Sequence, residues 1–182
     1  MSVKDLTQRL GTAIEALADK DSMGAMFHEH RDGTPLPSGP ALNEIVELCR
    51  AILFPGFYGN SNLNSKTLPY HIGINVERLY QLLSEHILAG LCFVESTEDA
   101  TCPTEKAQRI AAEFIGKLPE IRRILATDVE AAYNGDPAAT SFGEIISCYP
   151  VIKAISNYRI AHELLMQGVP LIPRIITEMA HS

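Results

Sequence analysis

Apolar residues recur at intervals of three and four along most of the chain, which is the spacing of one face of an α-helix. The longest example is a single stripe made by Ile72, Val76, Leu79, Leu83, Ile87 and Leu91. Runs of alternating β-branched residues, the usual signal of a half-buried strand, are almost absent. The pattern therefore predicts an all-α fold with six or seven helices.

Prolines, glycines and capping residues set the expected ends of these helices. The expected segments are Val3 to Asp19, Ala41 to Leu53, Pro69 to Glu95, Pro103 to Gly116, Pro119 to Tyr133, a helix after Ser141 that Pro150 restarts or kinks before Val151 to Gln167, and a last helix from Pro173. Ser2 with Asp5, and Ser141 with Glu144, have the spacing of capping boxes. Because glycine and proline crowd residues 20–40, we expect residues 1–40 to form one helix and a Gly/Pro-rich arm, and residues 41–182 to form the main domain.

Composition narrows the class of protein. Hydrophobic residues make up 46% of the sequence, which favours a globular fold over a disordered chain. The formal charge of -7 and the lack of clustered Lys and Arg argue against nucleic-acid binding. Apolar runs fall far short of the ~20 residues of a membrane span, and the first residues do not form a signal peptide. The four cysteines have neither disulfide-framework nor zinc-site spacing, so we expect reduced thiols and a cytoplasmic location.

Asp136 is the first candidate for a binding residue, because it directly precedes Pro137. A residue before proline is pushed toward extended backbone, so Asp136 should leave the helical ladder at a turn between two helices. Its carboxylate could then point into a cleft. The alternative is that Asp-Pro simply initiates a turn and the carboxylate caps the following backbone.

Asp128 lies on the same helix face as the apolar residues Ile121, Ile124 and Leu125, where a carboxylate needs a partner. Arg159 is the candidate, because its offsets from Ile152 and Ile155 place it on the inward face of its own helix, and guanidinium matches carboxylate in a two-pronged geometry. We predict a buried structural ion pair between Asp128 and Arg159.

Histidines complete the search for candidate chemistry. His162 follows Tyr158 by four residues, so both should face inward or toward a neighbouring chain. Imidazole can act as a general base, but a core or interface role is the favoured interpretation for His162. His28 and His30 flank Glu29, yet residues two apart face away from each other on a helix, so we expect no metal site.

The segment LPEIRRILATDVEAAYNGDPAATSFGEIISCYPVIKAISNYRIAHELLMQGVPLIPRIITEMAHS, Leu118 to Ser182, resembles the end of the helical domain of bacterial serine O-acetyltransferases with a longer N-terminal region. AILFPGFYG at Ala51 to Gly59 and HIGINVERLYQLL at His71 to Leu83 extend the resemblance to about two thirds of the chain. Residues 1–40 match no recognisable segment of that family.

The resemblance implies an enzyme that moves an acetyl group from acetyl-CoA to the serine hydroxyl in cysteine biosynthesis. In that family a histidine base and an orienting aspartate lie in a left-handed parallel β-helix that follows the helical domain. This sequence ends before the D-I-H-P segment of the family, and its glycines show no six-residue period. We therefore expect no catalytic residue, no bound cofactor and no activity in this chain alone. Asp136 and Pro137 match the position that helps to hold the ammonium of serine, or of a cysteine inhibitor.

The resemblance also implies partners. In the family the β-helix assembles trimers and the helical domains bring two trimers together, so we expect self-association through the N-terminal helices. A complex with the sulfhydrylase that binds the family's C-terminal tail is not expected. Two alternatives stay open at this point: a stand-alone helical regulatory or scaffolding protein that kept the oligomerisation surface and lost the enzyme, and a helical binding module unrelated to acetyl transfer.

Overall fold

A computed structural model describes residues 3–26, 36–94 and 103–181. Every regular element in these ranges is an α-helix or a 3-10 turn. The one β feature there is an isolated bridge between Pro55 and Tyr58. The prediction of an all-α fold is confirmed for this part of the chain. The chain divides into two compact units, residues 1–33 and 34–182, and each is described by itself. The predicted domain boundary at residue 40 stays a prediction.

The first unit contains α1 (Val3–Ala18), α2 (Lys20–Met23) and the 3-10 turn η1 (Gly24–Met26). The predicted first helix is confirmed to within one residue, while Ser2 of its predicted capping box lies outside the described residues. None of the α1 side chains is buried. Its large apolar residues Val3, Leu6, Leu10, Ile14 and Leu17 are 44–79% exposed. The apolar face of α1 is therefore exposed within the first unit.

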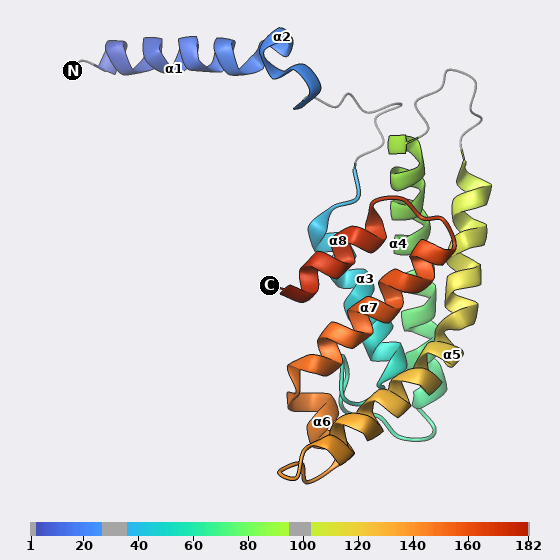
Figure 1. The fold of residues 1–182 in the computed structure, drawn as a ribbon. Helices are drawn as coiled ribbons and strands as arrows, with labels where there is room; N and C mark the ends of the chain where they lie inside the picture. The colour runs from blue at the N-terminus through green and yellow to red at the C-terminus, as the bar shows by residue number, and fades with distance from the viewer. Residues whose placement is uncertain (1–2, 27–35, 95–102, 182) are drawn as a thin grey trace. The chain divides into compact units, whose positions relative to one another are not determined.

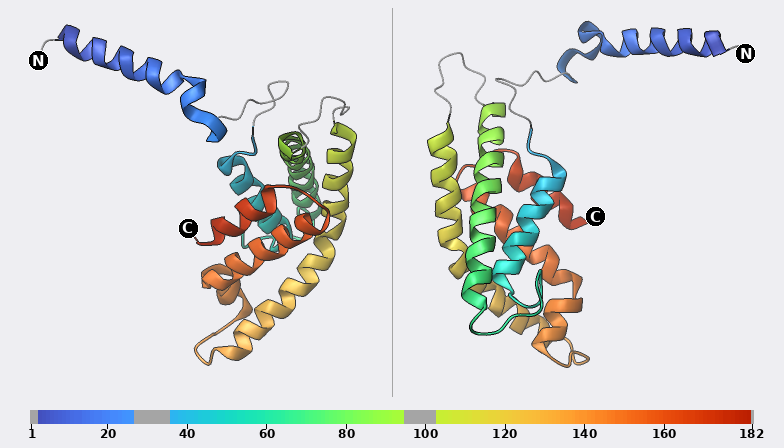
Figure 2. Two further views of the ribbon diagram at one scale, coloured as in Figure 1. Left: turned by 45° about the horizontal axis from the view of Figure 1, so that its top comes forward. Right: turned by 180° about the vertical axis from the view of Figure 1, so that it is seen from behind.

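The second unit is a helical bundle, drawn in Figure 1 and from two further sides in Figure 2. Its elements are α3 (Gly39–Leu53), α4 (Leu68–Val94), α5 (Thr104–Gly135), α6 (Phe142–Cys148), α7 (Pro150–Met166), α8 (Ile172–Glu178) and the 3-10 turn η3 (Met179–His181). The long helices α4 and α5 run side by side, α3 packs against α4, and α7 packs against both α5 and α8.

Local capping chemistry sets several helix ends in the bundle. Ser38 caps α3, because its hydroxyl accepts a hydrogen bond from the Ala41 N–H at 3.3 Å. α7 is followed by Gly168, whose positive φ of 76° suits glycine, and the Val169 N–H closes the turn on the Leu164 carbonyl at 3.1 Å. Pro150 begins α7 directly after α6.

The prediction of two helices on either side of Gly116 is wrong. Residues 104–135 form the single helix α5, with Pro119 inside it. Proline lacks the N–H for one helical hydrogen bond and tends to bend a helix instead of always ending it. Phe114, Leu118 and Ile121 are buried on both sides of this proline, so one continuous apolar stripe is packed against the bundle. Figure 1 shows that α5 changes direction along its length.

The core lies where the stripes of α3, α4, α5 and α7 meet. Phe114 is the largest fully buried side chain, and Leu79, Leu83 and Ile87 of the predicted α4 stripe are fully buried. Burying one such side chain stabilises a fold by roughly 1.5–3 kcal/mol. Packing of these stripes is thus the main source of stability of the second unit.

Three further features bear on function. No helix among the described residues is long and apolar enough to cross a membrane. The described part of the chain holds no group of three or more His, Cys, Asp or Glu side chains suited to a metal ion, and His28 and His30 lie outside it. Burial raises the pKa of the Cys49 thiol to about 12, so this thiol stays protonated and unreactive.

Candidate functional site

Asp136 lies where α5 ends, at the edge of the bundle. Its backbone is extended, with φ -119° and ψ 105°, as expected for a residue before proline. Its carboxylate Oδ1 accepts a hydrogen bond from the Ala138 N–H at 2.9 Å. The Asp136 carbonyl also accepts one from the Ala139 N–H at 3.0 Å. Pro137 itself is exposed, and its effect is to hold the backbone of Asp136 in this turn.

Tyr149 makes the second contact to this carboxylate. Its hydroxyl donates to Asp136 Oδ2 at 2.5 Å, the short distance typical of a bond from O–H to an anion. Tyr149 stands between α6 and α7, so the bond joins the end of α5 to that junction. The Tyr149 hydroxyl and the Ala138 N–H both lower the pKa of Asp136, which keeps its carboxyl ionised. The same bond raises the pKa of Tyr149 to about 12.

Glu144 adds a second carboxylate close to Asp136, at the corner that Asp136, Thr140, Glu144 and Tyr149 form between α5 and α7. Its Oε2 accepts hydrogen bonds from the Thr140 N–H at 2.7 Å and from the Thr140 hydroxyl at 2.6 Å. These bonds lower the pKa of Glu144, although the nearby Asp136 acts in the opposite direction. Ser141, the N-cap of α6, accepts from the Glu144 N–H at 3.2 Å, which is one half of the predicted capping box. Among the described residues neither Asp136 nor Glu144 forms an ion pair with a basic side chain.

The structure brings Asp128 and Arg159 into contact across α5 and α7. Arg159 Nε donates to Asp128 Oδ2 at 2.6 Å, and Arg159 Nη2 donates to Asp128 Oδ1 at 2.7 Å. The two side chains are 19% and 23% exposed, so the pair lies at the margin of the core and is not fully buried. The Asp128 carboxylate raises the pKa of Arg159. That this pair stabilises the domain stays a prediction.

Tyr158 and His162 lie on the outer face of α7. The two rings stack with centroids 5.8 Å apart, and Tyr158 is 54% exposed. The His162 side chain is also exposed, so neither residue belongs to the core. The four-residue spacing placed them correctly on one face, but that face turns outward because Ile152, Ile160 and Leu164 fill the inward one. The alternative that they contact a neighbouring chain stays a prediction.

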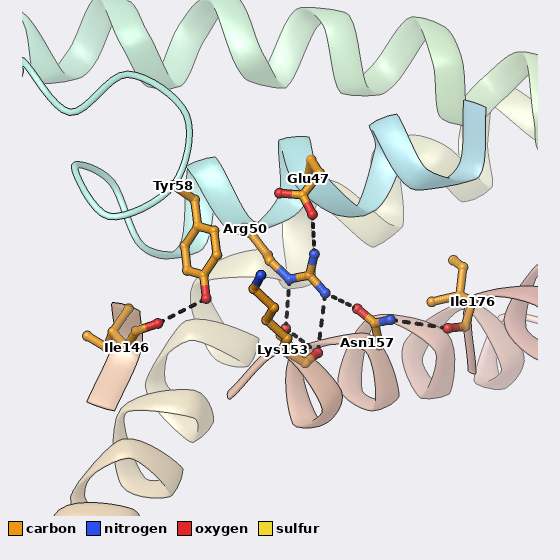
Figure 3. A network of polar contacts seen from close by, with 8 residues as sticks. Glu47, Arg50, Tyr58, Ile146, Lys153, Asn157 and Ile176 are labelled. Atoms are coloured by element: carbon orange, nitrogen blue, oxygen red, sulfur yellow. Dashed lines mark hydrogen bonds and ion pairs between the residues drawn. The ribbon is translucent and has the colours of Figure 1, made fainter. Parts of the chain in front are cut away.

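The most extensive polar contact in the bundle is one that the sequence analysis missed. Arg50 of α3 is only 5% exposed and reaches across to α7, as Figure 3 shows. Its guanidinium donates to Ser156 Oγ at 3.2 Å, to the Lys153 carbonyl at 3.3 Å, to Asn157 Oδ1 and to the Glu47 carboxylate. Asn157 in turn donates to the Ile176 carbonyl of α8 at 3.3 Å.

A sequence signal for Arg50 did exist. Arg50 follows Val46 by four residues and precedes Leu53 by three, which puts it on the inward stripe of α3. The same argument singled out Asp128. The chemistry of the Arg50 contacts is structural, because three of the acceptors belong to α7 and all are part of the chain itself.

The known proteins to which this chain is similar are serine acetyltransferases. No family model matches the sequence. A plasmid-encoded serine acetyltransferase of Synechococcus elongatus is 41% identical over 153 residues, which are 81% of this chain and 48% of that protein. A serine acetyltransferase of Mycobacterium tuberculosis is 41% identical over 51 residues, 28% of this chain and 22% of that protein. The chain thus spans about half the length, or less, of these curated relatives.

Solved structures agree in fold. Serine acetyltransferase 1 of Entamoeba histolytica, solved in complex with L-cysteine, superposes with a TM-score of 0.61 and 28% identity over 92% of this chain and 54% of that one. Its native form gives a TM-score of 0.62 and 30% identity over 91% of this chain and 54% of that one. The resemblance to the N-terminal helical part of serine acetyltransferases is confirmed in sequence and in fold.

Proposed function

We propose that this chain, a relative of the serine acetyltransferases, is the helical part of an enzyme that transfers an acetyl group from acetyl-CoA to the hydroxyl of L-serine. Within that enzyme it would supply part of the serine site and a self-association surface. The described residues form no β-helix. In this proposal the base and the acetyl-CoA site belong to a region outside the described residues, and we expect no turnover from residues 1–182 alone.

The observation that carries the proposal is the state of Asp136. Its carboxylate is ionised, is held by two hydrogen bonds, and has no cationic side chain as a partner among the described residues. A carboxylate has about four acceptor positions, so two bonds leave room for further donors. A substrate ammonium offers three N–H donors and the missing positive charge. This chemistry supports Asp136 as the group that holds the amino end of serine.

Asp136→Asn tests the substrate role in the longest natural form of the protein. The amide keeps the size of the side chain but loses its charge, so we expect the KM for serine to rise roughly tenfold, as for the loss of one charge-assisted hydrogen bond. The KM for acetyl-CoA should stay unchanged. Thiol release from acetyl-CoA gives both constants, with Glu120→Gln on the exposed face of α5 as control. An unchanged KM for serine would remove Asp136 from the site.

We also propose that α1 mediates self-association. Its exposed residues Val3, Leu6, Leu10, Ile14 and Leu17 are separated by intervals of three, four, four and three. The series is symmetric about Leu10, so an antiparallel second copy would place Leu10 against Leu10 and each outer residue against its counterpart. A helix of 16 residues is marginally stable without such packing.

Light scattering on a size-exclusion column tests this contact. We expect residues 1–182 to elute as more than the 20.0 kDa monomer, and Leu10→Glu to shift the population to monomer because it places a charge at the centre of the contact. Gln8→Glu adds the same charge on the opposite face of α1 and should leave the assembly intact. Only monomer at high protein concentration would contradict the proposal.

A further inference from the structure

We propose that Tyr149 is a positioning residue for Asp136: through its hydroxyl it fixes the orientation in which that carboxylate meets the substrate ammonium. The inference rests on the proposed role of Asp136 in the serine site. Tyr149 acts through Asp136 and is not itself a ligand of the substrate.

The first step is that the Ala138 bond alone does not fix the carboxylate. It engages Oδ1 from a residue only two positions further along the chain, in a turn at the exposed edge of the bundle. The terminal torsion of an aspartate side chain is broad, so Oδ2 could swing around this single contact. The Tyr149 bond to Oδ2 removes that freedom, because it holds the second oxygen from another part of the fold.

The second step is that Tyr149 is itself held in place. It ends α6, where its N–H donates to the Ile145 carbonyl at 3.2 Å, and Pro150 begins α7 directly after it. Its ring packs against the core of the bundle. The hydroxyl therefore reaches Asp136 from a rigid junction of two helices, and a rigid donor is what positions a binding group.

The third step concerns charge. Asp136 raises the pKa of Tyr149 to about 12 through their hydrogen bond, and burial and the nearby Glu144 act in the same direction. Tyr149 thus stays a neutral O–H donor throughout the physiological pH range. A Lys or Arg at this place would neutralise Asp136 and compete with the substrate ammonium, whereas a tyrosine orients the carboxylate and leaves its charge available.

Tyr149→Phe tests the positioning role in residues 1–182, without any assay of activity. The variant keeps the ring and removes only the hydroxyl, and a titration followed by carbon NMR gives the pKa of the Asp136 carboxyl. We expect that pKa to rise toward its ordinary value in Tyr149→Phe. Tyr133→Phe, in the last turn of α5 where the ring packs on Phe142, should leave that pKa unchanged. An unchanged Asp136 pKa in Tyr149→Phe would overturn the inference, whatever the function of the protein.

Kinetics in the longest natural form separate this inference from the proposed function. We expect Tyr149→Phe to raise the KM for serine roughly three- to tenfold, less than Asp136→Asn, with the KM for acetyl-CoA unchanged. If Asp136→Asn raises the KM for serine and Tyr149→Phe does not, the positioning role is wrong and the serine site stands. If Asp136→Asn has no effect on that KM, the proposed function of Asp136 fails, and the positioning role in catalysis fails with it.

Discussion

Arg50 and Asp136 are both charged residues at places where helices meet, but they are satisfied in opposite ways. Arg50 is buried between α3 and α7, and its guanidinium donates to four acceptors of its own chain, one of them the Glu47 carboxylate. Asp136 stands at the edge of the bundle, accepts two hydrogen bonds and has no cationic partner among the described residues. We infer that the first contact serves stability, while the second leaves acceptor positions of the carboxylate open, as the proposed serine site requires.

Removal of Arg50 should give the largest loss of stability. Arg50→Met keeps most of the length and apolar contact of the side chain but leaves buried Asn157 Oδ1 without its donor. We expect the free energy of unfolding to fall by about 3 kcal/mol, the range for losing a buried charged hydrogen-bond partner. Urea denaturation measures it.

Arg78→Met is the matched control for Arg50→Met. Arg78 also pairs with a glutamate of α3, since its Nη2 lies 3.0 Å from Glu44 Oε1, but both side chains are about half exposed. Exposed pairs of this kind contribute roughly 0–1 kcal/mol. Equal losses in the two variants would show that the burial of Arg50 is not what makes its contacts matter.

The Asp128–Arg159 pair is less buried than Arg50 and more buried than the Arg78 pair. It therefore tests whether the loss of stability on mutation follows the burial of the charged group. Asp128→Asn removes the charge from a two-pronged contact whose side chains are about one fifth exposed. We expect a loss of about 1–2 kcal/mol in the free energy of unfolding. Glu120→Gln, in an exposed pair with Lys117 on the same helix, should change it much less. An unchanged thermal midpoint in Asp128→Asn would end the idea of a structural pair.

Particular residues show how far sequence reasoning reached. Local signals, such as Ser141 before α6, placed helix ends well because the chemistry that starts or stops a helix is local. Pro119 misled because packing of α5 on both sides of it outweighs the missing hydrogen bond. The neighbourhood of Asp136 was predictable from the Asp-Pro pair, but its contact with Tyr149 spans thirteen residues and depends on how α6 folds back. Arg50 was missed because its three partners on α7 lie more than a hundred residues away.

His86 extends the comparison to a buried polar group that has no hydrogen-bond partner in the part of the chain that the structure describes. The ring is 6% exposed, and neither nitrogen has a hydrogen-bond partner among the described residues. Desolvation lowers the pKa of His86, so the folded state binds a proton less readily than the unfolded state. The stability that depends on neutral His86 is therefore complete above the ordinary pKa of histidine and decreases as the pH falls below it.

His86→Leu should remove this dependence on pH. We expect wild-type protein to lose stability from this group between pH 7.5 and pH 5.5, because the unfolded histidine titrates near roughly 6.5 and burial lowers the pKa in the folded state. The variant should lose less stability over the same interval, because leucine does not titrate. Thermal midpoints at both pH values measure the difference, and parallel changes in the two proteins would contradict it.

The smallest effect on stability should come from Asp136→Asn, the variant for which we expect a large effect on serine binding. Near neutral pH the amide oxygen can still accept from Ala138 or Tyr149, and the corner loses one of two carboxylates that stand close together without a basic partner among the described residues. The folded state lowers the pKa of Asp136, so its charge favours folding above the unfolded pKa, and this contribution is lost as the pH falls through the folded value. We therefore expect the thermal midpoints of variant and wild type to differ little at pH 7 and to converge further in acid. A midpoint loss at pH 7 as large as that of Arg50→Met would mean that Asp136 serves stability as Arg50 does. In that case the spare capacity of its carboxylate could no longer be taken as the sign of a binding site.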